Sequence, residues 1–533
     1  MATYYVAEGG TAANKAAATS GTYPGGCMSP AVHNGETFSA GDTIYLSDDG
    51  GVFRSYPNPP SSGSSESQIT YANKSGDTPV FKGSTLVSTW SDGGGNVWSA
   101  TLTTEPDQVF FDEVRGTLVA DLGSVDSEND WFWASSVLYV YSTSDPDSAF
   151  TSPGIEASGL DQCFYIYQKD YITLDGLTFK QSNSVGIRCI GSSTGIVIHN
   201  CTGSYNRNAA ISLGPGCVNY TIQDCVCEYN TGSGIACAGS GGPEITGLTV
   251  SGCTLRENIY IPGFSYDGAG IKAFLMHDSI ITGCTIYNND DGGVRLDGGT
   301  DPDWGCEDNV IEYCLIYGNG NATIENVGNI QVEFSKNNII RFNRCHSPYL
   351  SCNIIIGHAG SSGCEIYGNV LYNTTGANRA DIKTQSGVTG GAKIYNNTIY
   401  GSTQGIYLDD AGGSDVRNNC VSGSTQYDLQ YVVAAASGLT CDYNCFTGEG
   451  TTAIRRATVS NYTVAQHCST YSFDCNTITD DPGLTDPAGG DFTLASDSPC
   501  IGAGVDLGAS YDDALMPSST WPDGVVTGDQ DDY

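Results

Sequence analysis

The sequence predicts an all-β protein, a parallel β-helix made of stacked coils. The main observation is a short motif of two apolar β-formers, a polar spacer and then Cys or Asn. It reads IVIHNC at 196–201, IITGC at 280–284 and KIYNN at 393–397, and its Cys or Asn recurs every 22 to 31 residues. Such a unit cannot bury its apolar side alone, so successive units must stack. The 69 glycines and 32 tyrosines also suit tight turns between β-strands. The motif ends at Cys201, Cys225, Cys253, Cys284, Cys314, Asn343, Asn369, Asn397 and Asn419.

The pattern divides the chain into four stretches. Residues 1–85 hold an Ala-rich segment at 11–20, predicted to form a capping helix, and then the first coils. Residues 86–160 are rich in Trp and Asp and break the coil period, which predicts a β-rich insertion or side module. Residues 161–450 carry the coils, and 451–533 lose the period. We expect that tail to cover the open end of the β-helix, because terminal units of a solenoid need a cap.

Cysteine placement predicts a stack of buried thiols. Equivalent residues of stacked coils lie about 4.8 Å apart, which is longer than the roughly 3.8 Å between the Cβ atoms of a disulfide. The five motif cysteines are therefore expected to be free, with a metal site as the alternative. The motif asparagines are expected to continue the stack as a ladder of side-chain amides. The better disulfide candidates are Cys420, Cys441, Cys445, Cys468, Cys475 and Cys500.

The net charge of the chain limits the kinds of molecule that it is expected to bind. Only 15% of residues are charged, yet the net charge is −38. Acidity of this size argues against nucleic acid and anionic membranes, and it suits Ca²⁺, which prefers oxygen ligands. No apolar run reaches transmembrane length, so we expect no membrane insertion. The first residues have no signal-peptide pattern. We therefore expect an extracellular protein, secreted or displayed on a surface after removal of a signal, or a component of a phage particle.

A second column of strands places charged side chains on the outside of three consecutive coils. Each strand follows a motif turn, and its apolar residues alternate with outward ones. The outward residues are Lys272, then Arg295 with Asp297, then Gln331 with Glu333, and Lys383 lies farther along the same column. These residues predict a catalytic or substrate-binding face. The alternative is a solvated ion-pair network, although such pairs contribute little stability.

Acidic loops adjoin the same coils. Their carboxylates predict a Ca²⁺ site, because Ca²⁺ takes several oxygen ligands; the alternative is the turn chemistry of Asp in Gly-rich loops. The candidate ligands are Asp267, Asp290, Asp291, Asp301 and Asp303.

A third column lies three residues past the motif. It contains Tyr287, Tyr317, His346 and Tyr372, flanked by Arg256 and Tyr400. Stacked aromatic side chains can line a groove for sugar rings, with His346 as an acid or base. The alternative is structural packing.

The repeats IITGCTIYNNDDGGVRLDGG at 280–299 and KIYNNTIYGSTQGIYLDD at 393–410 resemble the pectate-lyase-like right-handed β-helix superfamily. The resemblance covers most of the chain and implies a right-handed solenoid with N-terminal and C-terminal caps. The superfamily includes polysaccharide lyases, glycoside hydrolases, epimerases, adhesins and phage tail-spikes. Alginate and related lyases of this fold use a Lys and an Arg from neighbouring coils, and Lys272 and Arg295 match that pair.

Three functions follow as hypotheses. The favoured one is a lyase that cleaves a uronate-containing polysaccharide by β-elimination. There Lys272 is the base, Arg295 or Ca²⁺ neutralises the uronate carboxylate, and His346 or a tyrosine protonates the leaving oxygen. The second is a glycoside hydrolase that uses Asp297 and Glu333. The third is a non-catalytic adhesin or tail-spike. We expect a monomer for an enzyme and a trimer for a tail-spike.

Overall fold

The computed structural model describes most of the chain. The described residues are 1–237, 241–260, 268–299, 304–321, 327–349, 351–358, 360–376, 379–409, 412–432, 437–448, 453–457, 460–516, 518–522 and 524–529. They form two compact units, the first made of Met1–Leu213 with Cys225–Ile235 and the second of Gly214–Asp224 with Ala236–Tyr533.

Three parallel sheets build the coils of the first unit. Sheet one contains β1 (Thr3–Ala7), β2 (Thr43–Ser47), β3 (Ile69–Asn73), β15 (Ile172–Asp175) and β18 (Val197–His199). Sheet two contains β4 (Val80–Lys82), β16 (Thr178–Lys180), β19 (Thr202–Ser204) and β22 (Val226–Glu228). Sheet three contains β14 (Gln162–Tyr167), β17 (Val185–Ile190), β20 (Ala209–Leu213) and β23 (Ser233–Cys237).

The first unit also carries a β-rich module with its own core. One sheet has the order β10 (Thr117–Leu118), β11 (Asp130–Ala134), β12 (Val137–Tyr141), β7 (Val97–Thr101) and β6 (Ser91–Asp92). The other has the order β5 (Ser84–Leu86), β13 (Ile155–Ser158), β8 (Val109–Phe111) and β9 (Val114–Arg115). Trp131, Leu138 and Phe111 are buried in this core. The tryptophans and alternating strands of this stretch therefore fill a separate apolar cluster.

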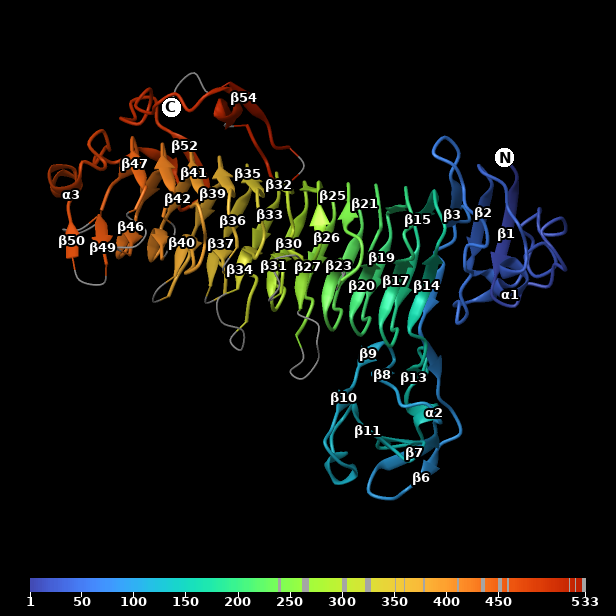
Figure 1. The fold of residues 1–533 in the computed structure, drawn as a ribbon. Coiled ribbons are helices and arrows are strands. Elements are labelled where there is room, and N and C mark those ends of the chain that lie inside the picture. The colour runs from blue at the N-terminus through green and yellow to red at the C-terminus, as the bar shows by residue number, and fades with distance from the viewer. Residues whose placement is uncertain are drawn as a thin grey trace. The chain divides into compact units, whose positions relative to one another are not determined.

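The second unit continues the same three-sheet pattern, and Figure 1 shows its strands stacked coil upon coil. Its sheet one contains β21 (Thr221–Gln223), β25 (Thr249–Ser251), β29 (Ile280–Thr282), β32 (Val310–Glu312), β35 (Ile339–Arg341), β38 (Glu365–Tyr367), β41 (Lys393–Tyr395), β44 (Asp415–Arg417) and β47 (Thr440–Asp442). Its sheet two contains β26 (Thr254–Arg256), β30 (Thr285–Tyr287), β33 (Leu315–Tyr317), β36 (Arg344–His346), β39 (Val370–Tyr372), β42 (Thr398–Tyr400), β45 (Cys420–Ser422) and β48 (Cys445–Phe446). Its sheet three contains β27 (Ala269–Ala273), β31 (Gly292–Asp297), β34 (Gly328–Glu333), β37 (Cys352–Gly357), β40 (Ala380–Thr384), β43 (Gln404–Leu408), β46 (Tyr427–Tyr431), β49 (Ile454–Arg456) and β50 (Ser460–Tyr462).

Three small two-stranded sheets complete the second unit. They are β24 (Ile245–Thr246) with β28 (Met276–His277), β51 (Leu484–Asp486) with β52 (Asp491–Leu494), and β53 (Asp513–Leu515) with β54 (Thr527–Asp529). The described helices of the chain are α1 (Pro30–Asn34), α2 (Pro146–Ala149) and α3 (Val464–Tyr471). No helix in the described part of the chain is long and apolar enough to cross a membrane.

The predicted helix over 11–20 is wrong, since that segment forms turns. The helix near this end is α1 instead, where the Ser29 side chain accepts a hydrogen bond from the Val32 N–H and Pro30 begins the first turn. Both features favour a helix start. In the Ala-rich segment the Asn14 side chain also accepts a hydrogen bond, from the Ala17 N–H at 3.2 Å, but the chain there makes turns only, so helix propensity and this contact do not produce a helix.

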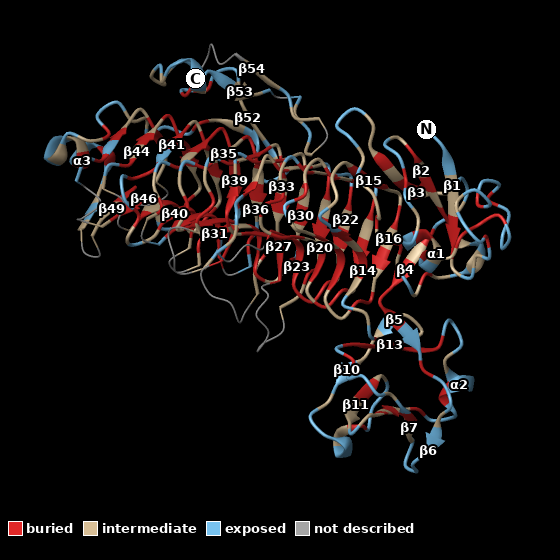
Figure 2. Cartoon of the chain, turned by 45° about the vertical axis from the view of Figure 1, so that its right-hand side comes forward, coloured by how far each residue is buried: buried red, intermediate tan, exposed pale blue. Residues whose placement is uncertain are grey.

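The strand register confirms the stacking that the motif predicts. In sheet three of the second unit, Val294 pairs with Ile330, and Ile330 pairs with Ile354. These side chains are fully buried inside the coil, and Figure 2 shows buried residues along the stacked strands. The Cys and Asn ladder also forms. The Cys284 N–H contacts Cys314 Sγ at 3.4 Å, and the Asn343, Asn369 and Asn397 amides continue the line.

The motif cysteines are buried and form no disulfide, as predicted. Of the six disulfide candidates, only Cys468 and Cys475 form a bond. Cys420, Cys441, Cys445 and Cys500 are free and buried, so that part of the prediction is wrong.

Candidate functional site

The charged residues predicted on the second column come together in the second unit. Lys272 of β27 pairs in register with Arg295 of β31. On the next strand, β34, Gln331 pairs with Arg295 and Glu333 pairs with Asp297. Parallel strands without an offset place equivalent residues side by side, so three coils supply one cluster.

Arg295 lies at the centre of this cluster. Its Nη2 atom lies 2.9 Å from Glu333 Oε2 and 3.3 Å from Asp297 Oδ2, and its Nη1 atom lies 2.8 Å from Asp291 Oδ2. Lys272 Nζ donates to Asp297 Oδ2 at 2.6 Å. Two cations thus hold three carboxylates in one network.

The burial of the cluster differs from what the alternation suggested. Ile271 and Val294, which directly precede Lys272 and Arg295, are buried inside the coil, so the charged side chains point outward from it. These charged side chains nevertheless do not face open solvent. Lys272 is 8% exposed, and Asp297 and Glu333 are each 5% exposed. The network is therefore not a solvated surface face.

Charge in this environment changes the ionisation of Asp297. Burial alone would raise the pKa of its carboxyl, but Lys272 and Arg295 outweigh that effect and hold the pKa below its usual value. The Gly299 N–H also donates to Asp297 Oδ1 at 2.6 Å. Asp297 is thus kept as a carboxylate.

A histidine and three aromatic side chains adjoin the cluster, and none of them was predicted from the sequence as a site residue. His358 Nε2 lies 2.7 Å from Glu333 Oε1, and the His358 ring stacks on Phe334 at 5.0 Å. Phe274 lies under Lys272 Nζ at 5.0 Å. A Cβ placed on Gly299 would lie within 4 Å of both Phe274 and Trp304. His358 and Phe334 directly follow the last residues of β37 and β34. This position just after a strand could have indicated from the sequence that their side chains lie near the cluster.

Gln331 has an unsatisfied polar atom. The residue is 3% exposed, and within the described part of the chain its Oε1 atom is buried without a hydrogen-bond partner. A buried acceptor without a partner costs about 1–3 kcal/mol. Such an atom beside Arg295 suits a site that is completed by a bound ligand.

The described part of the predicted calcium set does not converge. Asp267, Asp301 and Asp303 lie outside the described residues. Asp291 is paired with Arg295, and Asp290 Oδ2 accepts the Tyr260 N–H at 2.8 Å. Burial raises the pKa of Asp290. Both residues thus have protein partners, and calcium binding by this set stays a prediction.

The third column forms a continuous stack on sheet two of the second unit. Tyr287 and Tyr317 stack at 4.9 Å, as do Tyr317 and His346, and His346 and Tyr372 stack at 4.6 Å. Burial, together with Arg344, lowers the pKa of His346 to about 4. His346 lies on a different sheet from Lys272 and Arg295 and is held between two rings, so the structure does not bring it into the charged cluster.

Lys383 does not join the cluster either. It follows Gln331 by two strands in register, after Ile355, and its Nζ atom lies over the Tyr407 ring at 5.5 Å.

Comparison with known proteins identifies the fold. A family model described as "Right handed beta helix region" matches residues 147–265 and 185–370. The chain is a right-handed parallel β-helix. No curated protein sequence matches this β-helix significantly.

Three solved structures are similar to this chain. A structure of XylC in complex with xylose has a TM-score of 0.55 at 14% identity and covers 86% of each chain. A glycoside hydrolase has a TM-score of 0.44 at 11% identity, over 83% of this β-helix and 96% of that chain. The pectate lyase Pel9A has a TM-score of 0.37 at 16% identity, over 96% and 93%. Of these three, the XylC likeness, with a TM-score above 0.5, supports the fold, and at 14% identity it does not show the activity.

Proposed function

We propose that this β-helix is a glycoside hydrolase acting on a polysaccharide, with Asp297 and Glu333 as its catalytic carboxylates. The observation that carries the proposal is their register pairing on β31 and β34. Both carboxylates also contact the same Arg295 nitrogen. Those two oxygens therefore lie no more than about 6 Å apart, which suits the roughly 5–5.5 Å separation of a retaining glycosidase.

The surroundings suggest a role for each carboxylate. Asp297 is held ionised by Lys272 and Arg295, which suits the nucleophile that attacks the anomeric carbon. Glu333 contacts the half-exposed His358, a titratable group through which a proton can be exchanged with solvent. Glu333 would protonate the leaving glycosidic oxygen. It would then take a proton from the water that releases the sugar from Asp297.

The neighbouring aromatic rings support a sugar as the ligand. Phe274, Trp304 and Phe334 are each half-buried. Apolar walls with a few placed polar groups are typical of small-molecule sites, and a sugar ring offers both kinds of surface. The XylC structure, which shares the fold, holds xylose, and this is consistent with a carbohydrate ligand here.

The test is a panel of neutral and acidic polysaccharides and aryl glycosides, read for new reducing ends and for unsaturated-uronate absorbance. We expect reducing ends without that absorbance. Asp297→Asn and Glu333→Gln should each lower turnover at least about 10³-fold, because each removes an essential group. The matched control is Glu307→Gln. Glu307 Oε1 pairs with Lys336 Nζ at 3.1 Å, and both side chains are partly exposed. Full activity in both site variants would refute the assignment.

A lyase is the second candidate, because Lys272 and Arg295 are also paired in register. In that reading Lys272 must leave Asp297 to act as the base on C5, and Arg295 neutralises the uronate carboxylate. Calcium would assist in place of Arg295. Unsaturated-uronate absorbance that is lost in Lys272→Ala would establish this reading, and a loss on chelation would add calcium to it. Binding without either product would favour the non-catalytic adhesin.

A further inference from the structure

Two cysteines of sheet two occupy positions that face out of the coil. Cys420 and Cys445 are the first residues of β45 and β48 and pair with each other in register. The next residues, Val421 and Phe446, are fully buried inside the coil. The register partner of Cys420 on the preceding strand is Thr398. The position thus differs from that of the inward-facing Cys and Asn ladder, and core packing does not require a thiol there.

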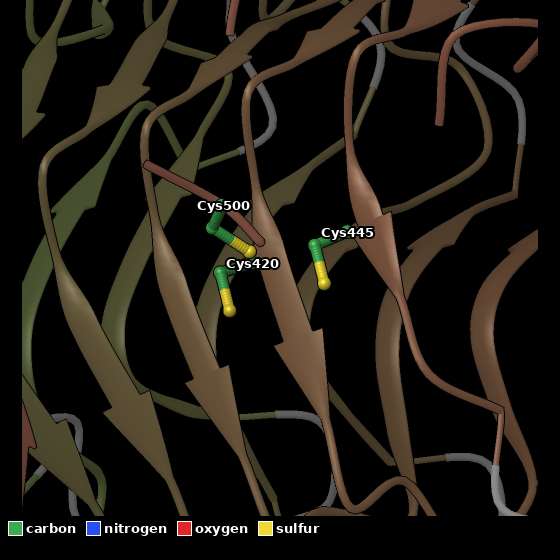
Figure 3. Close-up of side chains that lie close together, drawn as sticks. All are labelled: Cys420, Cys445 and Cys500. Carbon is green, nitrogen blue, oxygen red and sulfur yellow. The ribbon is translucent and has the colours of Figure 1, made fainter. Parts of the chain in front are cut away.

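A third cysteine comes to the same point from the C-terminal segment. Cys500 follows β52, and its Sγ atom and those of Cys420 and Cys445 all lie within 4.8 Å of one another. Figure 3 shows the three side chains close together beside these strands. All three are free and at most 4% exposed, and Ile478 and Leu494 pack around them.

A small pocket adjoins two of the three thiols. A pocket of about 10 Å³ is lined by Cys445, Cys500, Ile478 and Asn444, among others. This volume is close to the minimum that holds one water molecule. The Asp480 carbonyl oxygen, 3.6 Å from Cys445 Sγ, adds an oxygen atom at the edge of the cluster.

We propose that Cys420, Cys445 and Cys500 form a binding site for a thiophilic d¹⁰ cation such as Zn²⁺. A Zn–S distance of 2.3 Å places tetrahedral sulfur ligands about 3.8 Å apart, so the observed cluster needs only small side-chain shifts. The three thiols lose their protons to solvent as the metal–sulfur bonds form, and no electron is transferred. A water molecule in the small pocket beside Cys445 and Cys500 would be the fourth ligand in this proposal.

Such a site would fasten the C-terminal segment to the coils of its own unit. The same segment carries Phe492, which packs on Tyr372 at 4.8 Å, and Val505, whose N–H donates to Asn418 Oδ1 at 3.0 Å. A metal bound only in the folded state stabilises that state, so it should resist local detachment of this segment.

The test uses the full chain, reduced and freed of metal by a chelator, and then exposed to Zn²⁺. Zinc content after desalting should rise from none to one per chain, and the melting temperature should rise with it. Cys500→Ala should lose this zinc, whereas Cys352→Ala, which removes a buried cysteine of β37, should keep it. Because a variant could fail to fold, alkylation of the wild-type chain during slow unfolding gives a second measurement. Zn²⁺ should delay labelling of these three cysteines more than labelling of the other buried cysteines.

Two results would overturn the proposal. One is the absence of bound zinc in the reduced wild-type chain, or zinc that persists in a folded Cys500→Ala variant. The other is a disulfide between Cys500 and Cys420 or Cys445 in the purified protein, with no zinc bound after that disulfide is reduced.

Discussion

Lys272 Nζ lies 2.6 Å from Asp297 Oδ2, and both side chains are buried. The two residues belong to neighbouring coils, so their contact ties β27 to β31 as well as setting the charge of the candidate site. Burial makes each charge depend on the other. An ion left unpaired in such a place costs far more than a surface pair gains.

The first prediction therefore concerns stability. Lys272→Ala should lower the free energy of unfolding by about 3 kcal/mol, near the low end for breaking a buried pair, because Arg295 still contacts Asp297. Urea denaturation measures this loss. Lys383→Ala is the control, since Lys383 is half-buried and contacts the face of Tyr407, and it should cost no more than about 1 kcal/mol. Equal losses for the two variants would mean that the Lys272 pair is no more than a surface contact.

A second prediction concerns a buried row of hydrogen-bonded side chains that is separate from the Cys and Asn ladder and ends at Asp381. Asn329 Nδ2 donates to Asn353 Oδ1, and Asn353 Nδ2 donates to Asp381 Oδ1, each at 2.7 Å. Burial raises the pKa of Asp381 to about 6, although hydrogen bonds from Ser402, Thr374 and Asn353 oppose the rise. The protonated acid is thus the form that the fold prefers.

The sign of the pH dependence follows from this shift. Because the folded pKa lies above the unfolded value of about 3.9, the contribution to stability is complete below about pH 4 and is lost as the pH rises through about 6. Asp381→Asn keeps the acceptor without the charge. It should raise the free energy of unfolding at pH 8 by about 2–3 kcal/mol, at about 1.4 kcal/mol for each pKa unit. Asp278→Asn, at an exposed turn, should not. A stability profile from pH 4 to 8 that is unchanged by Asp381→Asn would contradict the assignment.

The third prediction concerns thiol accessibility. Of the 21 cysteines, Cys468 and Cys475 form a disulfide, and all the others are buried thiols outside any disulfide. Cys225, Cys253 and Cys284 should react with a thiol reagent only after unfolding, because the reagent cannot reach a buried thiol. Peptide mapping after labelling the native and the denatured protein measures this. Rapid labelling of any of the three in the native protein would show that the ladder opens locally.

Coil stacking was predictable because its causes are local and repeated. Ile271, Val294 and Ile330 occupy the same place in each coil, so alternation and spacing together assign them to the interior. The Asn and Cys ladder followed from the same repeat. The outward direction of Lys272 and Arg295 was also predictable from alternation.

Burial and partner choice were not predictable in this way. Strand alternation predicts that the Lys272 side chain points outward from the coil. Whether solvent or other groups surround that side chain depends on packing by other parts of the chain. His358 joined the cluster through a turn position outside the strand pattern. Cys500 met Cys420 through a C-terminal segment that has no repeat, and a wrong disulfide prediction resulted. Three-dimensional contacts decided each of these cases.

The last prediction separates two parts of the aromatic column. Tyr317 is half-buried and stacks between Tyr287 and His346, so its ring edge can contact a sugar. Tyr372 is only 9% exposed, and it is covered by Phe492 and accepts a hydrogen bond from Arg344 Nε at 3.1 Å.

If the open part of the column binds glycan, Tyr317→Ala should weaken binding about tenfold, equivalent to about 1.4 kcal/mol, while Tyr317→Phe should keep it. Tyr372→Ala should instead lower the free energy of unfolding by about 3 kcal/mol, as for other buried aromatic truncations. Calorimetric titration with oligosaccharides and urea denaturation give the two readouts. A loss of affinity in Tyr372→Ala with unchanged stability, together with normal binding by Tyr317→Ala, would place the sugar contacts on the covered end of the column instead.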